Sequence, residues 1–274
     1  MKGIKFSIFV MLLMVVVLLV GACQPAVSPP TATEVPPPTE TPKLPSRILF
    51  IGDSFTYWNE GLDTHMVPLA ASANPPMTIE ASSVTKGGFD LEKQWEISSA
   101  QEAIQEGNWD VVVLQEDLAM YGYDEQEFYE YARKFDEEIK NIEAQTVLYM
   151  PWEYNIKGTK TTEDIARAYN SIGVELEVRV APVGLAWARS IQERPDLDLY
   201  GNDKVHPSVR GTYLTLCVLY ATIFEQSPVG LSYQLAEQID KDSEKWEKWQ
   251  LTEDELAFLQ RIAWETVVDY QAEQ

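Results

Sequence analysis

The 274-residue chain is poor in the residues from which several common kinds of site are built. Two cysteines exclude a disulfide framework. The only histidines, His65 and His206, are far apart, so no zinc site is expected. Lys and Arg number 21 against 43 Asp and Glu, a net charge of -22 that argues against nucleic acid and anionic lipid surfaces as partners. The sequence also has no Gly-x-Ser-x-Gly elbow and no glycine-rich phosphate loop.

The N-terminus has the pattern of a targeting signal. Lys2 and Lys5 precede an apolar run, Phe9 to Val20, that is short for a membrane span. Val20-Gly-Ala-Cys23 then resembles the lipobox of bacterial lipoproteins. This resemblance implies a signal peptide at 1–22, lipidation of Cys23 (palmitate and similar chains) and anchoring at the extracytoplasmic face of the cell membrane. An ordinary signal peptide and an uncleaved anchor are the alternatives.

Residues 23–45 are mainly Pro, Thr and Glu. Such a segment cannot bury enough apolar surface to offset the entropy lost on ordering, so we predict an extended tether. It would hold a folded domain, 46–274, away from the membrane. Cys217 lies in an apolar helical run of that domain and is interpreted as a small core residue.

Within the domain, apolar segments alternate with amphipathic ones. Strands are expected at Arg47–Ile51, Met77–Val84, Trp109–Leu114, Thr146–Met150 and Glu177–Pro182. Helices are expected at Thr64–Ser72, Leu91–Gln105, Glu125–Ile142, Glu163–Ile172, Leu185–Gln192 and Pro207–Phe224, with two more closing the chain. The alternation predicts a parallel sheet with helices on both faces. Such sheets bind ligands at the carboxyl ends of their strands.

Ser54 stands at that edge, in Gly52-Asp53-Ser54 directly after the first strand. The segment is either a turn with a helix cap or the site of a nucleophile. Asp203 precedes His206 by three residues, a spacing that lets a carboxylate orient the imidazole as a general base. The alternative is a loop in which Pro207 begins a helix. His65 has no evident partner and is interpreted as structural.

Stabilisation of an oxyanion needs preorganised donors. Gly87 and Gly88 follow the second strand, and a glycine allows backbone N–H groups to approach a ligand. Gln115 ends the third strand, and its amide can donate. Three aromatic residues also follow strand ends and could pack in the core or stack on a sugar ring: Trp58, Trp152 and Tyr154.

Together these motifs resemble the SGNH (GDSL-type) hydrolases over about Arg47 to Phe224. Gly52-Asp53-Ser54 matches the family's first block, and Asp203-Lys-Val-His206 matches its Asp-x-x-His block. The resemblance implies a flavodoxin-like three-layer α/β/α sandwich with a mainly parallel five-stranded sheet. The third block departs, because Gln115 stands where the family usually has an asparagine.

The resemblance further implies a Ser54-His206-Asp203 triad and an oxyanion hole formed by Ser54, Gly87 or Gly88, and Gln115. No metal or organic cofactor is required. The expected function is hydrolysis of a small acyl ester, such as a carbohydrate O-acetyl group, by a membrane-anchored serine esterase. An acyltransferase acting on sugars and a catalytically degenerate surface binding lipoprotein are the alternatives.

Overall fold

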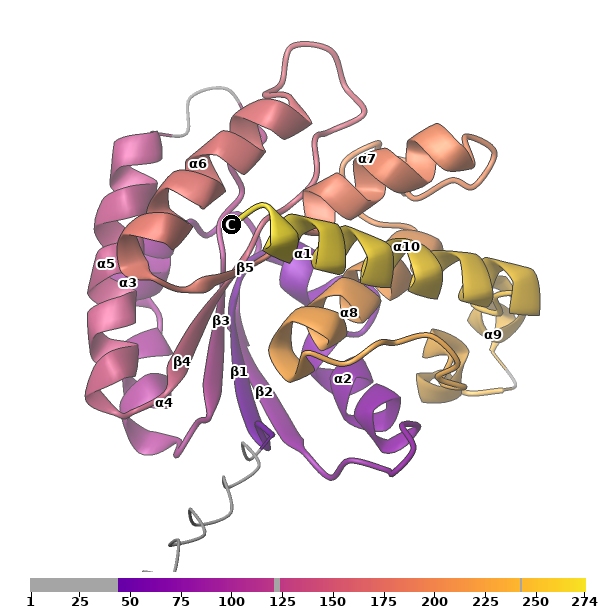
Figure 1. Ribbon diagram of the computed structural model, residues 1–274, viewed down its shortest axis with the longest axis horizontal. Helices are drawn as coiled ribbons and strands as arrows, with labels where there is room; N and C mark the ends of the chain where they lie inside the picture. The colour runs from indigo at the N-terminus through magenta and orange to yellow at the C-terminus, as the bar shows by residue number, and fades with distance from the viewer. Residues whose placement is uncertain (1–43, 121–123, 242) are drawn as a thin grey trace, which may run out of the picture. The chain divides into compact units, whose positions relative to one another are not determined.

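The computed structural model describes residues 44–120, 124–241 and 243–274. Its sheet has five parallel strands in the order β2-β1-β3-β4-β5 (Figure 1). The strands are β1 (Arg47–Gly52), β2 (Glu80–Thr85), β3 (Val111–Gln115), β4 (Gln145–Tyr149) and β5 (Arg179–Ala181). Each expected strand is present, and the order is that of flavodoxin-like folds.

Helices cover both faces of the sheet, which confirms the predicted three layers (Figure 1). One face carries α3 (Leu91–Ile97), α4 (Ala100–Glu106), α5 (Glu125–Asn141) and α6 (Thr162–Leu176). The other carries α2 (Leu62–Ala71) and α8 (Val209–Phe224), with α7 (Val183–Glu193) and α10 (Glu253–Ala272) packed against α8. Three short elements complete the described fold: α1 (Ser54–Tyr57), the 3-10 helix η1 (Leu235–Gln238) and α9 (Glu244–Lys248).

Helix α8 is the centre of its layer, because every residue from Gly211 to Phe224 is buried. It lies between the sheet and α10, which leaves none of its faces to solvent along this stretch. A helix that is apolar all round fits such a place. Cys217 is fully buried on it, as predicted for a core residue.

Two helix predictions were wrong in detail. The helix expected over 91–105 is two helices, because Ser98 is extended and its hydroxyl accepts a hydrogen bond from the backbone N–H of Ala100. Helix α8 begins at Val209 rather than at Pro207, with Ser208 as the N-cap residue whose side chain accepts from Gly211. At the C-terminus the predicted capping box of Thr252 and Glu255 is present at the start of α10.

The predicted signal peptide at 1–22, Cys23 and most of the tether lie outside the described residues. Within the described ranges, no helix combines the length and the apolar composition needed to cross a bilayer.

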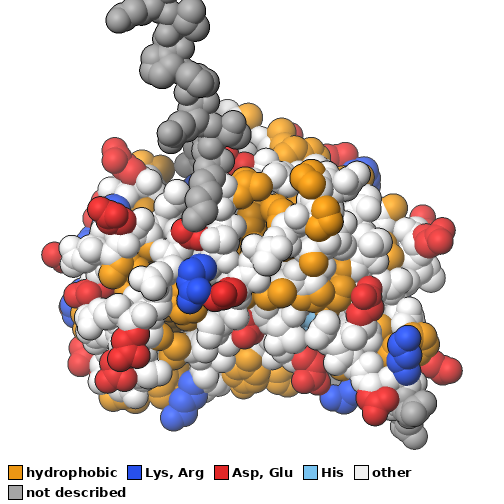
Figure 2. Space-filling model, turned by 90° about the horizontal axis from the view of Figure 1, so that it is seen from below, with side chains coloured by type: hydrophobic (Ala, Val, Ile, Leu, Met, Phe, Trp, Pro, Cys, Tyr) orange, Lys and Arg blue, Asp and Glu red, His pale blue; other side chains and the backbone are white. Residues whose placement is uncertain are grey.

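Figure 2 shows the face at the amino ends of the strands. On its described part, basic side chains are scattered among acidic and apolar ones and form no continuous patch.

Candidate active site

Ser54 is the first residue of α1, at the carboxyl end of β1, which lies between β2 and β3 in the sheet. The preceding Asp53 caps this short helix, since its Oδ1 accepts from the backbone N–H of Phe55 at 2.9 Å. Gly52 is required by close packing, because a Cβ there would lie 2.5 Å from Oε1 of Gln115. Gly52 and Asp53 therefore each have a local structural reason, and together they turn the chain so that Ser54 stands at the carboxyl edge of the sheet.

Gln115 lies beneath this turn and is fully buried. Its Oε1 accepts from the backbone N–H of Asp53 at 2.8 Å and from the hydroxyl of Thr56 at 3.0 Å. Its Nε2 has no hydrogen-bond partner within the described chain and is buried too. The contacts of Gln115 are thus with the turn that carries Ser54, and its predicted role as an oxyanion donor stays a prediction.

The segment from Gly201 to Ser208 forms a compact loop before α8. The backbone N–H of Gly201 donates to the carbonyl of His206 at 2.7 Å. Oδ1 of Asp203 accepts from the backbone N–H groups of Val205 and His206, both at 3.0 Å. Burial opposes ionisation of Asp203, but these bonds and the His206 ring outweigh it and lower the pKa of the carboxyl. The loop therefore holds an ionised carboxylate at the imidazole.

The three residues predicted as a triad lie in one hydrogen-bonded chain. Nδ1 of His206 is 2.7 Å from Oδ2 of Asp203, and Nε2 of His206 is 2.9 Å from Oγ of Ser54. With the carboxylate accepting from Nδ1, Nε2 is left to accept from the serine hydroxyl. Residues 152 positions apart in sequence thus form the arrangement that activates a serine.

Two residues that follow the segment of Ser54, Trp58 and Asn59, hold His206 in place, and neither role could be predicted from the sequence. The indole of Trp58 stacks on the His206 ring, with centroids 3.9 Å apart and planes 14° from parallel. Nδ2 of Asn59 donates to the carbonyl of Pro207 and to the hydroxyl of Thr212, at 3.2 and 2.8 Å. The nucleophile segment and the histidine loop are therefore joined by direct contacts outside the triad.

Three buried carboxyl groups, those of Asp53, Glu116 and Asp117, follow the carboxyl ends of β1 and β3. Burial and the nearby Asp117 raise the pKa of Asp53 to about 7. Burial likewise raises the pKa of Asp117, whose carboxylate accepts from the Tyr154 hydroxyl, and raises that of Glu116 well above its ordinary value. Such perturbed carboxyls are common at functional sites. Among the described residues, however, no group of three His, Cys, Asp or Glu side chains is arranged to hold a metal ion.

Gly87 and Gly88 lie in the exposed loop after β2. Because β2 pairs with β1 in parallel, this loop and Ser54 both follow carboxyl ends of neighbouring strands. Gly88 has a φ of +70°, a conformation that favours glycine. A Cβ on Gly87 would lie 2.8 Å from the hydroxyl of Tyr57. Both glycines are thus needed for the shape of this loop, and their role toward an oxyanion stays a prediction.

Trp58, Trp152 and Tyr154, which could pack in the core or stack on a sugar ring, all contact other side chains of the chain. Trp152 is 1% exposed and stacks on Trp187, and Tyr154 is buried against Asp117. Trp58 is stacked on the ring of His206. His65 is buried as a structural residue, with hydrogen bonds of 2.6 Å to the Tyr233 hydroxyl and 2.7 Å to the Asn59 carbonyl.

No protein-family model matches the chain, and no curated protein matches it. Solved structures do resemble it. A protein described as a putative SGNH hydrolase from Slackia heliotrinireducens is 24% identical, with a TM-score of 0.54 over 65% of this chain and 98% of that one. An acetylxylan esterase from Geobacillus stearothermophilus is 19% identical, with a TM-score of 0.53 over 65% and 94%.

A DUF4886 family protein from Bacteroides uniformis matches more of the chain. It covers 81% of this chain and 95% of its own length at a TM-score of 0.58, with 14% identity. At these identities the similarity concerns the fold. The five-stranded parallel sheet with helices on both faces is therefore the α/β fold shared with SGNH hydrolases.

Proposed function

We propose that this chain is a serine esterase in which Ser54 is the nucleophile, His206 the general base and Asp203 the residue that orients it. The observation that carries this proposal is the hydrogen-bonded chain from Asp203 Oδ2 through the imidazole to Ser54 Oγ, at 2.7 and 2.9 Å. A neutral serine hydroxyl is a weak nucleophile, and this arrangement supplies the base that it needs.

In the first half of the reaction, Oγ of Ser54 attacks the ester carbonyl carbon while Nε2 of His206 takes the hydroxyl proton. The resulting oxyanion is stabilised by the backbone N–H of Ser54 and of the Gly87-Gly88 loop. The tetrahedral intermediate then expels the alcohol, which takes the proton from Nε2. Asp203 stabilises the imidazolium throughout.

In the second half, water attacks the acyl-enzyme and His206 again accepts and returns the proton. The acid is released and Ser54 is regenerated. Neither half requires a metal or an organic cofactor, since the charges that develop lie within reach of the groups described. The similarity in fold to an acetylxylan esterase makes a carbohydrate O-acetyl ester the preferred substrate.

The proposal extends to location. The lipobox-like segment ending at Cys23 and the Pro/Thr-rich residues that follow support a lipid-anchored enzyme at the extracytoplasmic face of the membrane. There it would meet polymeric or oligomeric carbohydrate esters.

Hydrolysis of p-nitrophenyl acetate and of acetylated xylo-oligosaccharides tests the reaction. Wild-type protein should release acetate from both. Ser54→Ala and His206→Ala should lower kcat by several orders of magnitude, because the triad acts as a unit. Ser171→Ala is the matched control, since Ser171 is an exposed serine on α6 whose hydroxyl donates to the Arg167 carbonyl. An inactive wild type, or an active Ser54→Ala variant, would exclude the proposed esterase.

A further inference from the structure

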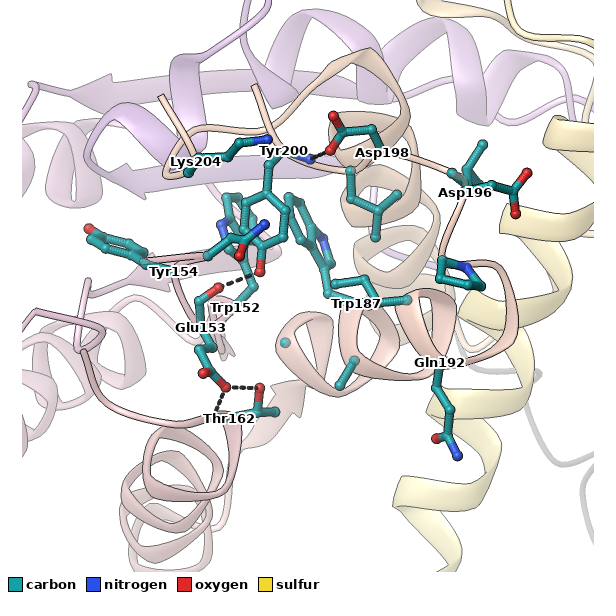
Figure 3. Close-up of a pocket in the computed structure, with 17 residues that line it drawn as sticks. Trp152, Glu153, Tyr154, Thr162, Trp187, Gln192, Asp196, Asp198, Tyr200 and Lys204 are labelled. Carbon is teal, nitrogen blue, oxygen red and sulfur yellow. Dashed lines mark hydrogen bonds between the residues drawn. The ribbon is translucent and has the colours of Figure 1, made fainter. Parts of the chain in front are cut away.

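A cavity of about 690 Å³ lies beside the loop that carries His206 (Figure 3). This volume is within the range of about 300–1,000 Å³ that is typical of small-molecule sites. Tyr154 and Lys204 lie at one end of the cavity, and Gln192 and Asp196 at the other. Lys204 belongs to the loop that carries Asp203 and His206, and Trp152 of the cavity wall packs on Phe55, the residue after Ser54, with ring centroids 4.6 Å apart.

The cavity wall and the histidine loop are hydrogen-bonded to each other. Nε1 of Trp152 donates to the carbonyl of Val205 at 2.9 Å, and the backbone N–H of Asn155 donates to the carbonyl of Lys204 at 3.1 Å. A ligand in the cavity would therefore contact residues whose positions are coupled to the catalytic base.

The floor of the cavity is preformed. Trp152 and Trp187 stack with centroids 3.9 Å apart and planes 6° from parallel, and each is only 1% exposed. The Tyr200 hydroxyl donates to the carbonyl of Glu153 at 2.6 Å, and Oε2 of Glu153 accepts from the backbone N–H of Thr162 at 3.0 Å. Because these groups are already held, binding would need little ordering of the protein.

The rim, in contrast, is polar and largely exposed. Asn155 and Gln192 present amide groups, which can both donate to and accept from hydroxyl groups. Three carboxylates, those of Glu153, Asp196 and Asp198, face one ammonium group, that of Lys204. Because negative charge predominates, an anionic ligand is disfavoured.

We propose that this cavity binds the neutral oligosaccharide chain that bears the ester, on the side of the leaving alcohol. The proposal rests on the proposed esterase function. It adds where the carbohydrate part of the substrate binds and that this part is uncharged. Amides and carboxylates match a ligand that carries many hydroxyl groups and no charge, and such a chain would lie against the loop that carries His206.

The Asn155→Ala/Gln192→Ala double variant tests the cavity. Both side chains are exposed at the rim, so the floor and the triad should be unchanged. Loss of the two amide groups, and of the hydrogen bonds they would make to the ligand, should raise KM for an acetylated neutral oligosaccharide about tenfold. For p-nitrophenyl acetate, kcat/KM should stay at the wild-type value. Asn141→Ala is the control, an exposed amide at the far end of α5.

An unchanged KM for the oligosaccharide, with p-nitrophenyl acetate still hydrolysed, would overturn the cavity proposal and leave the esterase intact. Binding can also be measured without turnover, by titrating unacetylated xylo-, cello- and manno-oligosaccharides into the Ser54→Ala protein. We expect one of these to bind and the double variant to lose that binding. If none binds, or if oligogalacturonate binds as tightly, the proposal is wrong whether or not the chain is an esterase.

Discussion

Replacement of Asp53 by asparagine should stabilise the protein, and more so at alkaline pH. Asp53 is 3% exposed, and its burial together with the nearby Asp117 raises the pKa of the carboxyl from an ordinary 3.8 to about 7. Asparagine keeps a side-chain oxygen that can accept from the backbone N–H of Phe55, as Asp53 does at 2.9 Å. The substitution therefore removes the buried charge and preserves the helix cap.

The direction follows from proton binding. Because folding raises the pKa of Asp53, the folded protein binds more protons than the unfolded chain between pH 3.8 and about 7. The contribution of Asp53 to stability is therefore most favourable below pH 3.8 and declines as the pH rises to about 7. Each pKa unit corresponds to about 1.4 kcal/mol, so ionised Asp53 lowers the free energy of unfolding by about 4 kcal/mol at pH 8. At pH 4.5 the same linkage relation gives about 1 kcal/mol.

Urea unfolding of wild type and Asp53→Asn at pH 4.5 and pH 8 measures the difference. The stabilisation by asparagine should be larger at pH 8 by about 3 kcal/mol. Asp124→Asn is a matched control, because Oδ1 of Asp124 caps α5 through Gln126 at 2.8 Å in the same way but is exposed. Equal stabilisation by Asp53→Asn at both pH values would refute the reasoning that Asp53 is buried and protonated near neutrality.

Three further outcomes are expected. Gln115→Ala should lower the melting temperature, because the Asp53 N–H and the Thr56 hydroxyl lose their acceptor. If Gln115 also donates to the oxyanion, kcat determined by active-site titration should fall on the order of 10²–10³-fold. An unchanged kcat would remove Gln115 from the site. Trp58→Leu should lower kcat about two- to fivefold with KM little changed, because the variant loses a stacking interaction with His206 worth about 0.5–1 kcal/mol. An unchanged kcat would show that Trp58 does not position His206. Wild-type protein should partition into detergent on phase separation and Cys23→Ser should not; equal partitioning would exclude lipidation.

The sheet could be predicted from sequence because its strands are marked locally. Uninterrupted apolar runs such as 111–114 belong to buried parallel strands, and amphipathic segments between them indicate the crossover helices. Helix boundaries were less certain where serines compete for backbone hydrogen bonds, as at Ser98.

The two motifs that carry Ser54 and His206 could be found in the sequence, and the structure brings the two side chains within 2.9 Å, but the contacts that hold the motifs together could not be predicted. Asn59 reaches Thr212 across 153 positions, and Trp58 meets His206 only after the fold has closed. Nothing in the composition of either segment marks such a contact. The sequence left two possibilities for Trp152 and Tyr154, because an aromatic residue after a strand can pack inward or face a ligand, and both residues are buried.

Covalent labelling with a fluorophosphonate, followed by peptide mass spectrometry, tests the central claim most directly, because the probe reacts with an activated serine hydroxyl. We predict one adduct, on Ser54, absent from Ser54→Ala and formed orders of magnitude more slowly by His206→Ala, since only the pair held at 2.9 Å activates the hydroxyl. An adduct on a different residue, or labelling of His206→Ala at the wild-type rate, would contradict the assignment of Ser54 as a nucleophile activated by His206.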